Sequence, residues 1–272
     1  MGDFDVCFCN DGLVSRASAH VELTDRGLTL GDAVFETMRV RGGRVVDIDR
    51  HLERLAAACD CLGFLAVADS QALSAALEST RTANAVVEGV LRLTLTRGCG
   101  GRGLAPAQDL RPTVIVTASL LPVRSPGFRA VTASVTRRNE QSPLSRIKST
   151  GYLDNILALR EALSRGADDA LLLNTGGRVA CFSAANLFTR LGSVVMTPPL
   201  ADGVMPGTVR RRMMEQLPVR EASLTPAELV LADEIIATNS LGVRQLVALD
   251  GKALSSEPIL FGQAQAIYDA LT

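Results

Sequence analysis

One lysine of this 272-residue chain stands where its amine can act as a nucleophile. Lys148 lies in the stretch SRIKSTGYLDNILALREAL, shortly before an apolar-periodic segment that predicts a helix from about Tyr152 to Ser164. Partial burial and the positive end of a helix dipole both disfavour an ammonium ion, so the amine is expected to be neutral near neutral pH. A neutral amine is what Schiff-base chemistry requires. An ordinary exposed lysine beside a helix cap is the alternative.

Two other segments have residue types that suit a phosphate group. Gly207 and Thr208 open a predicted helix in LADGVMPGTVRRRMME, where free backbone N–H groups and a hydroxyl favour an anion. Thr238, Asn239 and Ser240 follow a predicted strand and add further donors. A plain helix cap and ordinary turn chemistry are the respective alternatives.

A third candidate for phosphate binding lies near the start of the chain. His51 and Arg54 are spaced i and i+3 on one face of a predicted helix. From that position a guanidinium can grip a phosphate with two parallel hydrogen bonds. A solvated arginine is the alternative. Each of these signals is weak alone, and their order along the chain is what makes them informative.

The overall composition favours a globular protein with a small-molecule site. Hydrophobic residues make up 47% and charged residues 21%, and the formal net charge is −1, which gives no field to attract nucleic acid or an anionic membrane. Six cysteines without a CxxC pair, and only two histidines, predict no metal site. An acidic start and the lack of an apolar run near ~20 residues favour a cytoplasmic protein with reduced cysteines.

Hydrophobic periodicity divides the first part of the chain into strands and helices. Residues 33–40, AVFETMRV, alternate as a strand does, and the following Gly-Gly pair predicts a tight turn before Val45. Asp49 is expected to cap a helix that ends at Gly63. The other predicted elements are a helix from about Ser70 to Ala83 and two β-branched strands, VLRLTLTRG and RPTVIVTAS.

A linker separates this part from the rest of the chain. LLPVRSPGF holds two prolines and a glycine, so we predict an N-terminal α+β domain at 1–121, a linker at 122–128 and a C-terminal domain at 129–272. Strands outnumber helices, which favours an α+β arrangement in two lobes over a doubly wound sheet. Besides the helix after Lys148, the second domain is predicted to contain the strands AVTASVTRR, DALLLN, RVACFSAANLFTRL, SVVMTPP and DEIIATN, and a helix from about Gly207.

In their order these motifs resemble fold-type IV pyridoxal-phosphate enzymes, the class IV aminotransferase family. The resemblance runs from about Thr24 to Leu246 and rests on GDAVFETMRV, HLERL, IKSTGYLDNILA, AANLF, TPPL and MPGTVRR. It implies a two-domain fold like that of D-amino acid aminotransferase, with pyridoxal 5'-phosphate in a cleft between the domains and a cofactor-binding C-terminal domain. It also implies a homodimer that acts on a small-molecule amine.

The resemblance assigns roles to individual residues. Lys148 becomes the Schiff-base lysine and proton shuttle, and Arg54 a phosphate ligand. Thr208 and Val209 become the start of the phosphate-binding helix, next to Gly207. Residues 238–240 fall at the second phosphate-binding turn of the family.

Within the family, TRGCGGRGLAP and AANLFTRLGSVVMTPPL are most similar to aminodeoxychorismate lyase, which forms 4-aminobenzoate and pyruvate for folate synthesis. One departure bears on this choice. The family usually has a glutamate five residues before the asparagine of the NLF-type motif, where its carboxylate holds a proton on the pyridine nitrogen. Counting back from Asn186 gives Cys181, whose neutral thiol cannot stabilise a pyridinium by charge. A lyase, whose product becomes aromatic, tolerates a weak electron sink better than an aminotransferase does.

Two other functions stay open at this point. An aminotransferase would act on a D-amino acid, a branched-chain amino acid or an amine, with Arg39, Arg92 and Arg97 as candidate carboxylate ligands, although each suits a solvated strand position equally well. A catalytically degenerate protein that binds the cofactor or a partner without turnover is the third interpretation, because of Cys181. Formation of pyridoxamine phosphate with an amino acid would favour the aminotransferase.

Overall fold

The computed structural model describes residues 4–64, 69–107, 110–254 and 257–271, which divide into two compact units. Unit 1 comprises the chain up to Pro122 together with Ile147–Gly151, and unit 2 comprises Val123–Arg146 and Tyr152–Leu271. The short segment that carries Lys148 therefore belongs to the N-terminal unit. The domains predicted from the sequence place residues 129–272 together and so do not anticipate that this segment returns to unit 1. The return depends on backbone hydrogen bonds between segments that are far apart in sequence.

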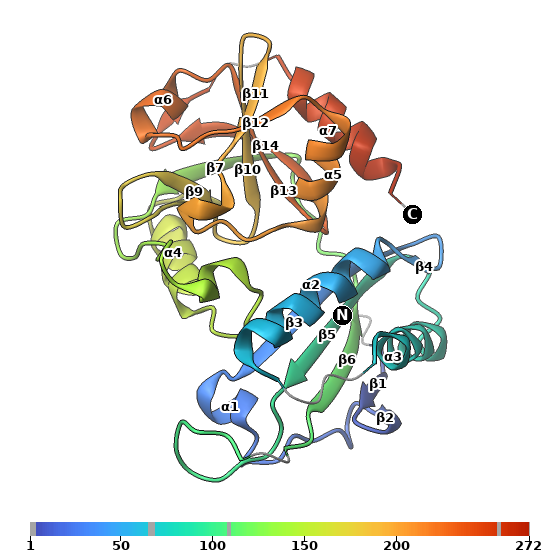
Figure 1. The fold of residues 1–272 in the computed structure, drawn as a ribbon. Helices are drawn as coiled ribbons and strands as arrows, with labels where there is room; N and C mark the ends of the chain where they lie inside the picture. The colour runs from blue at the N-terminus through green and yellow to red at the C-terminus, as the bar shows by residue number, and fades with distance from the viewer. Residues whose placement is uncertain (1–3, 65–68, 108–109, 255–256, 272) are drawn as a thin grey trace. The chain divides into compact units, whose positions relative to one another are not determined.

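Unit 1 is built on an antiparallel sheet with the strand order β2-β1-β6-β5-β3-β4 (Figure 1). The predicted hairpin between β3 and β4 is confirmed: Gly42 and Gly43 have φ of 54° and 74°. Positive φ at both central residues is what a two-residue type I′ turn needs. The strands of this sheet are β1 (Val6–Cys9), β2 (Gly12–Ser15), β3 (Ala33–Arg41), β4 (Arg44–Val45), β5 (Gly89–Thr96) and β6 (Thr113–Ser119).

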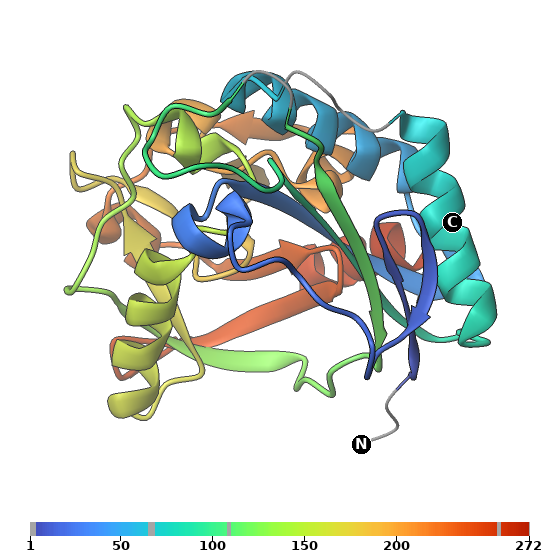
Figure 2. The same ribbon diagram turned by 90° about the horizontal axis from the view of Figure 1, so that it is seen from below.

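Two amphipathic helices pack on this sheet. The predicted helix at 70–83 is confirmed as α3 (Ser70–Ala83), which lies against β1 and β6, beside the dark-blue β1–β2 hairpin in Figure 2. The other helix, α2 (Ile48–Leu62), packs on β3; its N-cap is Asp47, in the left-handed conformation, rather than Asp49. A short helix, α1 (Arg26–Leu30), precedes β3. The core between helices and sheet includes Val34, Met38, Leu52, Leu55, Leu73, Leu77, Leu91, Leu93 and Val116.

Unit 2 is built on a mixed sheet with the order β12-β11-β10-β13-β14-β7-β8-β9, and β15 pairs with β14. Strand β7 runs parallel to both neighbours, and β11 runs parallel to β12; the other pairs are antiparallel. Its strands are β7 (Gly127–Thr132), β8 (Asp169–Leu173), β9 (Val179–Phe182), β10 (Asn186–Leu191), β11 (Val194–Thr197), β12 (Val219–Glu221), β13 (Glu234–Asn239), β14 (Gly242–Leu249) and β15 (Lys252–Ala253).

Helices cover this second sheet. Helix α4 (Leu153–Ser164) packs on β7 and β8, α5 (Thr208–Gln216) on β13, and α7 (Ile259–Asp269) on β13 and β14, while α6 (Pro226–Val230) is short. The predicted α+β architecture is thus confirmed. No helix in the described ranges is both long and apolar enough to span a bilayer; the predicted cytoplasmic location stays a prediction.

Two strands of unit 2 differ from their predicted lengths. The run at 178–191 forms two strands, because Ser183 begins a turn between them: its carbonyl accepts from Asn155 Nδ2 (2.7 Å) and its N–H donates to Asp169 Oδ1 (3.2 Å). The strand predicted at 130–138 ends at Thr132. Beyond it, a side-chain carboxylate rather than a strand accepts from the backbone N–H groups of Ser134 and Val135.

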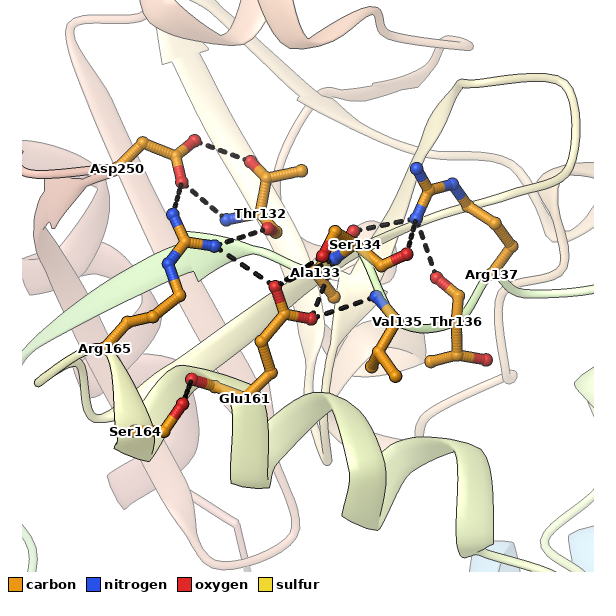
Figure 3. Close-up of polar contacts among 10 residues, drawn as sticks. All are labelled: Thr132, Ala133, Ser134, Val135, Thr136, Arg137, Glu161, Ser164, Arg165 and Asp250. Atoms are coloured by element: carbon orange, nitrogen blue, oxygen red, sulfur yellow. Dashed lines mark hydrogen bonds and ion pairs between the residues drawn. The ribbon is translucent and has the colours of Figure 1, made fainter.

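Glu161 of α4 is the acceptor that holds the segment after β7 (Figure 3). Its carboxylate accepts from the N–H groups of Ser134 (2.9 Å) and Val135 (3.0 Å) and from the Ser134 hydroxyl (2.8 Å). Arg165, the C-cap residue directly after α4, donates to Glu161 and to the Thr132 carbonyl. Although burial alone would raise it, these donors hold the pKa of Glu161 at about 2.

This arrangement predicts an acid-sensitive contribution to stability. The pKa of Glu161 lies below its ordinary value of 4.5, so its contribution is complete above pH 4.5 and is lost as the pH falls towards 2. We expect Glu161→Gln to lower the free energy of unfolding by about 1–2 kcal/mol at pH 7, after allowance for solvent screening. Urea unfolding at pH 7 and pH 3 checks this: the difference between variant and parent should shrink at pH 3, and an equal difference at both would contradict it.

Candidate active site

Lys148 lies in an extended segment that is hydrogen-bonded to the start of β3. The Phe35 N–H donates to the Lys148 carbonyl, and the Thr150 N–H donates to the Ala33 carbonyl, each at 2.9 Å. The side chain returns over the same strand, with Nζ 4.3 Å from the centre of the Phe35 ring. The Arg92 guanidinium carbon lies 3.7 Å from that ring centre as well. Two cationic groups thus share one aromatic ring of unit 1.

The surroundings of Lys148 favour its neutral form. Burial, followed by the positive charge of Arg54 and then that of Arg92, lowers the pKa of Lys148 to about 8, against the opposing effect of Glu36. Burial agrees with the prediction from sequence. The neighbouring charges that act on the amine belong to Arg54 of α2, Glu36 of β3 and Arg92 of β5; a contribution from a helix end stays a prediction. An amine with this pKa is partly neutral at neutral pH and can act as a nucleophile or a base.

A buried carboxylate connects these residues. Glu36 of β3 is fully buried and accepts from Arg54 Nε at 2.8 Å, from Arg54 Nη2 at 2.6 Å and from His51 Nδ1 at 2.6 Å. Burial alone would raise the pKa of Glu36, but the charge and hydrogen bonds of Arg54, together with His51, lower it to about 2. The acid is therefore ionised at every pH at which the protein is expected to work.

Glu36 changes the expectation for Arg54. The Nε and Nη2 edge of the guanidinium, one of the edges that could bind a phosphate with two parallel hydrogen bonds, is occupied by the carboxylate. A role for Arg54 in phosphate binding stays a prediction. In this arrangement such a role would have to use another part of the guanidinium than the Nε and Nη2 edge. The sequence held a signal for Glu36. It has the two-residue spacing of Val34 and Met38, which places a charged residue on the apolar face of a strand.

In unit 2, the start of α5 is closely packed against β10. Gly207 is the N-cap residue, and no side chain caps this end of α5. A Cβ on Gly207 would lie 2.0 Å from Asn186 Oδ1. Asn186 is itself buried and donates from Nδ2 to the Met205 carbonyl at 2.8 Å. Only glycine fits this position while Asn186 keeps its place, and the uncapped N–H groups of the first turn suit an anion.

The predicted second phosphate-binding turn lies beside this helix start. Thr238 of β13 is opposite Asn186 of β10 in the sheet register. Its hydroxyl is buried and has no hydrogen-bond partner among the described residues, which is the condition expected of a group that serves a ligand. Asn239 shapes the following turn: its Oδ1 accepts from the Leu241 N–H, and the Ser240 carbonyl accepts from the Tyr268 hydroxyl. The predicted residues of unit 2, including buried Thr208 and Val209, thus fit a phosphate group.

Gly207 therefore offers a direct test of the predicted phosphate site. We expect Gly207→Ala to weaken binding of pyridoxal phosphate by about tenfold or more, because Asn186 must move from its hydrogen bond and the helix start shifts with it. Fluorescence titration of the cofactor measures the effect. The double variant Asn186→Ala/Gly207→Ala removes the clash and should recover part of the affinity. Equal affinity in the parent and Gly207→Ala would show that the helix start does not bind the phosphate.

Cys181 lies in β9, buried among small apolar side chains that include Ala158 and Ala162 of α4. Burial raises the pKa of the Cys181 thiol, the more so because Asp169 is near, although Arg138 acts in the opposite direction. The thiol is therefore neutral. It has no charge with which to hold a proton on a ring nitrogen.

The three arginines predicted to bind a substrate carboxylate have different surroundings. Arg39 forms an ion pair with Glu88 and donates to the Gly89 carbonyl. Arg97 donates to Asp32 Oδ2 at 2.7 Å and to the carbonyls of residues 62 and 63. These contacts favour structural roles for both. Arg92 lies on the same ring as Lys148, which favours it among the three, and its role in substrate binding stays a prediction.

Taken unit by unit, these features define a class of protein. Unit 1 supplies a partly buried lysine with a lowered pKa, beside an ion-paired glutamate. Unit 2 supplies an uncapped helix start and an unsatisfied hydroxyl that suit a phosphate. An enzyme that uses a lysine amine together with a phosphorylated carbonyl cofactor needs both kinds of group.

Comparison with known proteins agrees with this class. The family model for amino-transferase class IV matches residues 33–249. The chain is 30% identical over 262 residues to a putative branched-chain-amino-acid aminotransferase of Methanocaldococcus jannaschii, covering 93% of this chain and 90% of that protein. It is 30% identical over 238 residues to an aminodeoxychorismate lyase of Vibrio harveyi, covering 82% and 84%.

Similar solved structures likewise include both a lyase and an aminotransferase. A putative 4-amino-4-deoxychorismate lyase of Legionella pneumophila superposes with a TM-score of 0.88 at 28% identity, covering 93% of this chain and 96% of that one. A branched-chain aminotransferase of Thermoproteus uzoniensis superposes with a TM-score of 0.89 at 28% identity, covering 96% and 93%. The chain belongs to the class IV aminotransferase family. This confirms the predicted fold-type IV family of pyridoxal-phosphate enzymes.

Proposed function

We propose that the protein is a pyridoxal-phosphate-dependent lyase that converts 4-amino-4-deoxychorismate to 4-aminobenzoate and pyruvate. The observation that carries the proposal is Cys181, a buried neutral thiol at the position where the family usually has a glutamate. A cofactor ring without a charged partner at its nitrogen is a weaker electron sink. Elimination that makes the product aromatic needs that sink less than transamination does.

The roles of the residues follow from their surroundings. When bound, pyridoxal phosphate supplies an electron sink for the carbon that bears the substrate amine. The neutral fraction of Lys148 would remove the proton from that carbon, and the C–O bond to the three-carbon side chain would break as the substrate ring becomes aromatic. The enolpyruvate that leaves would take up a proton at its methylene carbon and so become pyruvate. Thr238 and the start of α5 are proposed to bind the phosphate.

Product analysis of the purified protein tests this proposal. Incubation with pyridoxal phosphate and 4-amino-4-deoxychorismate should release 4-aminobenzoate and pyruvate in equal amounts, with no pyridoxamine phosphate. Accumulation of pyridoxamine phosphate with an amino acid, in the absence of lyase products, would overturn the lyase in favour of an aminotransferase. A protein that binds the cofactor and forms neither set of products would be the degenerate member of the family.

An aminotransferase acting on a D-amino acid, a branched-chain amino acid or an amine is the second candidate. The likeness to the M. jannaschii protein covers more of the chain than the likeness to the V. harveyi lyase does. A D-alanine aminotransferase of Bacillus licheniformis is 27% identical over 259 residues. Arg92, beside Lys148, is the arginine that would then bind the substrate carboxylate.

We also propose that the protein forms a homodimer through an apolar face of α4. This face comprises Leu153, Ile156, Leu157 and Leu163, which are 41–74% exposed and lie on the side of α4 away from the sheet. Ile156→Asp should weaken dimerisation by about tenfold or more, because it removes roughly 1.5–3 kcal/mol of apolar burial. Light scattering over a concentration series measures this, and Leu231→Asp, at an exposed position after α6, is the control. An unchanged dimer would exclude this face.

A further inference from the structure

Helix α7 is hydrogen-bonded to both ends of strand β13. At the start of the helix, the carboxylate of Glu234, the first residue of β13, accepts from the N–H groups of Leu260 and Phe261, each at 2.7 Å. In the last turn of the helix, the Tyr268 hydroxyl donates to the Ser240 carbonyl, one residue after β13, at 3.2 Å. Glu234 and Tyr268 are both buried. The helix therefore holds β13 at its beginning and at the turn that follows it.

The contact at Ser240 falls on the turn that is predicted to bind the phosphate. Strand β13 ends at Asn239 and β14 begins at Gly242, so Ser240 and Leu241 form a two-residue turn. The peptide group between these two residues is the centre of the turn, and turns of different type differ in the direction that this group faces. Its N–H donates to Asn239 Oδ1 at 2.9 Å, and its carbonyl accepts from Tyr268. Side chains thus hold both polar groups of the central peptide.

Packing alone does not explain the hydroxyl of Tyr268. The buried residues of α7 include Leu260, Ala264 and Ile267, and the helix packs on α5, β13 and β14 (Figure 1). A phenylalanine would place the same ring in this packing. The hydroxyl adds a partner for one carbonyl, which lies two residues from Thr238, whose buried hydroxyl has no partner among the described residues.

We propose that Tyr268 is a positioning residue for the cofactor phosphate: through the Ser240 carbonyl it fixes the turn at 238–240 in the orientation that binds the phosphate. This inference deepens the proposed function and rests on it for the phosphate site. A turn that is already fixed presents its donors to an anion without a prior change of the backbone. Without the hydroxyl the central peptide has other orientations open to it, and the apparent affinity falls with the fraction of molecules that are ready to bind.

A hydrogen bond that serves the fold alone makes a different prediction. If Tyr268 only attached α7 to the sheet, loss of its hydroxyl would lower the melting temperature and would affect cofactors with and without a phosphate equally. If Tyr268 positions the turn, the affinity for the phosphorylated cofactor should fall while the affinity for the other stays. The ratio of the two affinities therefore separates the two roles, because a general loosening of unit 2 cancels in it.

The experiment compares pyridoxal phosphate with pyridoxal, which has the same ring and aldehyde but no phosphate. The full-length protein is freed of cofactor, and each probe is titrated by fluorescence. Tyr268→Phe should raise the Kd of pyridoxal phosphate by about fivefold, the effect of about one net hydrogen bond, and should leave the Kd of pyridoxal unchanged. Gln265→Ala is the matched control, because it removes a hydrogen bond to Asp269 on the same helix. It should keep the parent ratio.

A second variant tests whether Tyr268 acts through the central peptide of the turn. Asn239→Ala releases the N–H of that peptide and should also lower the preference for pyridoxal phosphate. Because both side chains hold one group, adding Tyr268→Phe to Asn239→Ala should cost less affinity than it costs in the parent. Circular dichroism selects the folded variants. Losses that add in full would contradict a shared peptide and overturn the inference.

An unchanged ratio of affinities in Tyr268→Phe, or equal losses for the two probes, would also overturn it. The parent protein shows which proposal has failed. A parent that binds pyridoxal as tightly as pyridoxal phosphate would contradict the phosphate site of the proposed function, and this inference with it. A parent that prefers pyridoxal phosphate, with a Tyr268→Phe variant that keeps the whole preference, would overturn this inference alone.

Discussion

A Lys148→Ala variant is expected to lose the absorbance of lysine-bound pyridoxal phosphate and to lose turnover by a factor of about 10³ or more. Under the proposed function, the variant lacks the amine that bonds to the cofactor, and it lacks the base that moves the proton, a role that alone contributes roughly 10²–10⁴. Absorbance spectra and borohydride trapping measure the first effect, and steady-state rates measure the second. The residues of unit 2 that are proposed to bind the phosphate are unchanged in this variant, so non-covalent binding of the cofactor should persist.

Lys252→Ala is the matched control, because Lys252 is the other lysine of the chain and lies exposed in β15. It should keep the parent spectrum and rate. Reduction that places the cofactor on Lys252 in the parent protein would contradict the assignment. So would a Lys148→Ala variant with parent activity.

A Cys181→Glu variant should have the second largest effect, and the effect should depend on the cofactor. A carboxylate at this buried position, among alanine and valine side chains, is expected to cost the cofactor-free protein about 3 kcal/mol, on the order of 10 °C in melting temperature. If the cofactor ring nitrogen lies at this position, added pyridoxal phosphate supplies a partner for the charge. The variant should then gain more stability from the cofactor than the parent does, and transamination should increase relative to lyase activity.

Cys181→Gln separates charge from size. It has the shape of the glutamate but no charge, so it should gain no more than the parent does from added cofactor. Differential scanning fluorimetry with and without pyridoxal phosphate gives the comparison. Equal gains for Cys181→Glu and Cys181→Gln would mean that no ring nitrogen lies near this residue.

The elements that could be predicted from the sequence are those that local patterns determine. Helix α3 has an apolar stripe and a capping aspartate, and the β3–β4 hairpin has two glycines where positive φ is needed, so both were found at or close to their observed ends. The break between β9 and β10 was missed because no glycine or proline marks it. Its turn depends on a hydrogen bond donated by Asn155 and one accepted by Asp169, both of which are distant in sequence.

The candidate site shows the same limit. Lys148 and Gly207 could be proposed from the sequence because short motifs mark them. The pairing of Glu36 with Arg54 was missed, since an acid in a strand and an arginine in a helix 18 residues later acquire meaning only when α2 packs on β3. The sequence also could not show that the Arg54 edge suited to a phosphate is already bound to a carboxylate. Both are tertiary facts, and no local pattern encodes them.

The return of Ile147–Gly151 to unit 1 has a consequence for how the protein is made. During synthesis on the ribosome, unit 1 cannot complete the edge of β3 until residue 151 has left the exit tunnel, by which time the first strand of unit 2 has also emerged. Until then the N–H of Phe35 and the carbonyl of Ala33 lack their partners, and an open strand edge is prone to pair with other chains. The lysine proposed to carry the chemistry thus also closes the N-terminal unit, so that a nascent chain protects this edge only once Lys148 has been added.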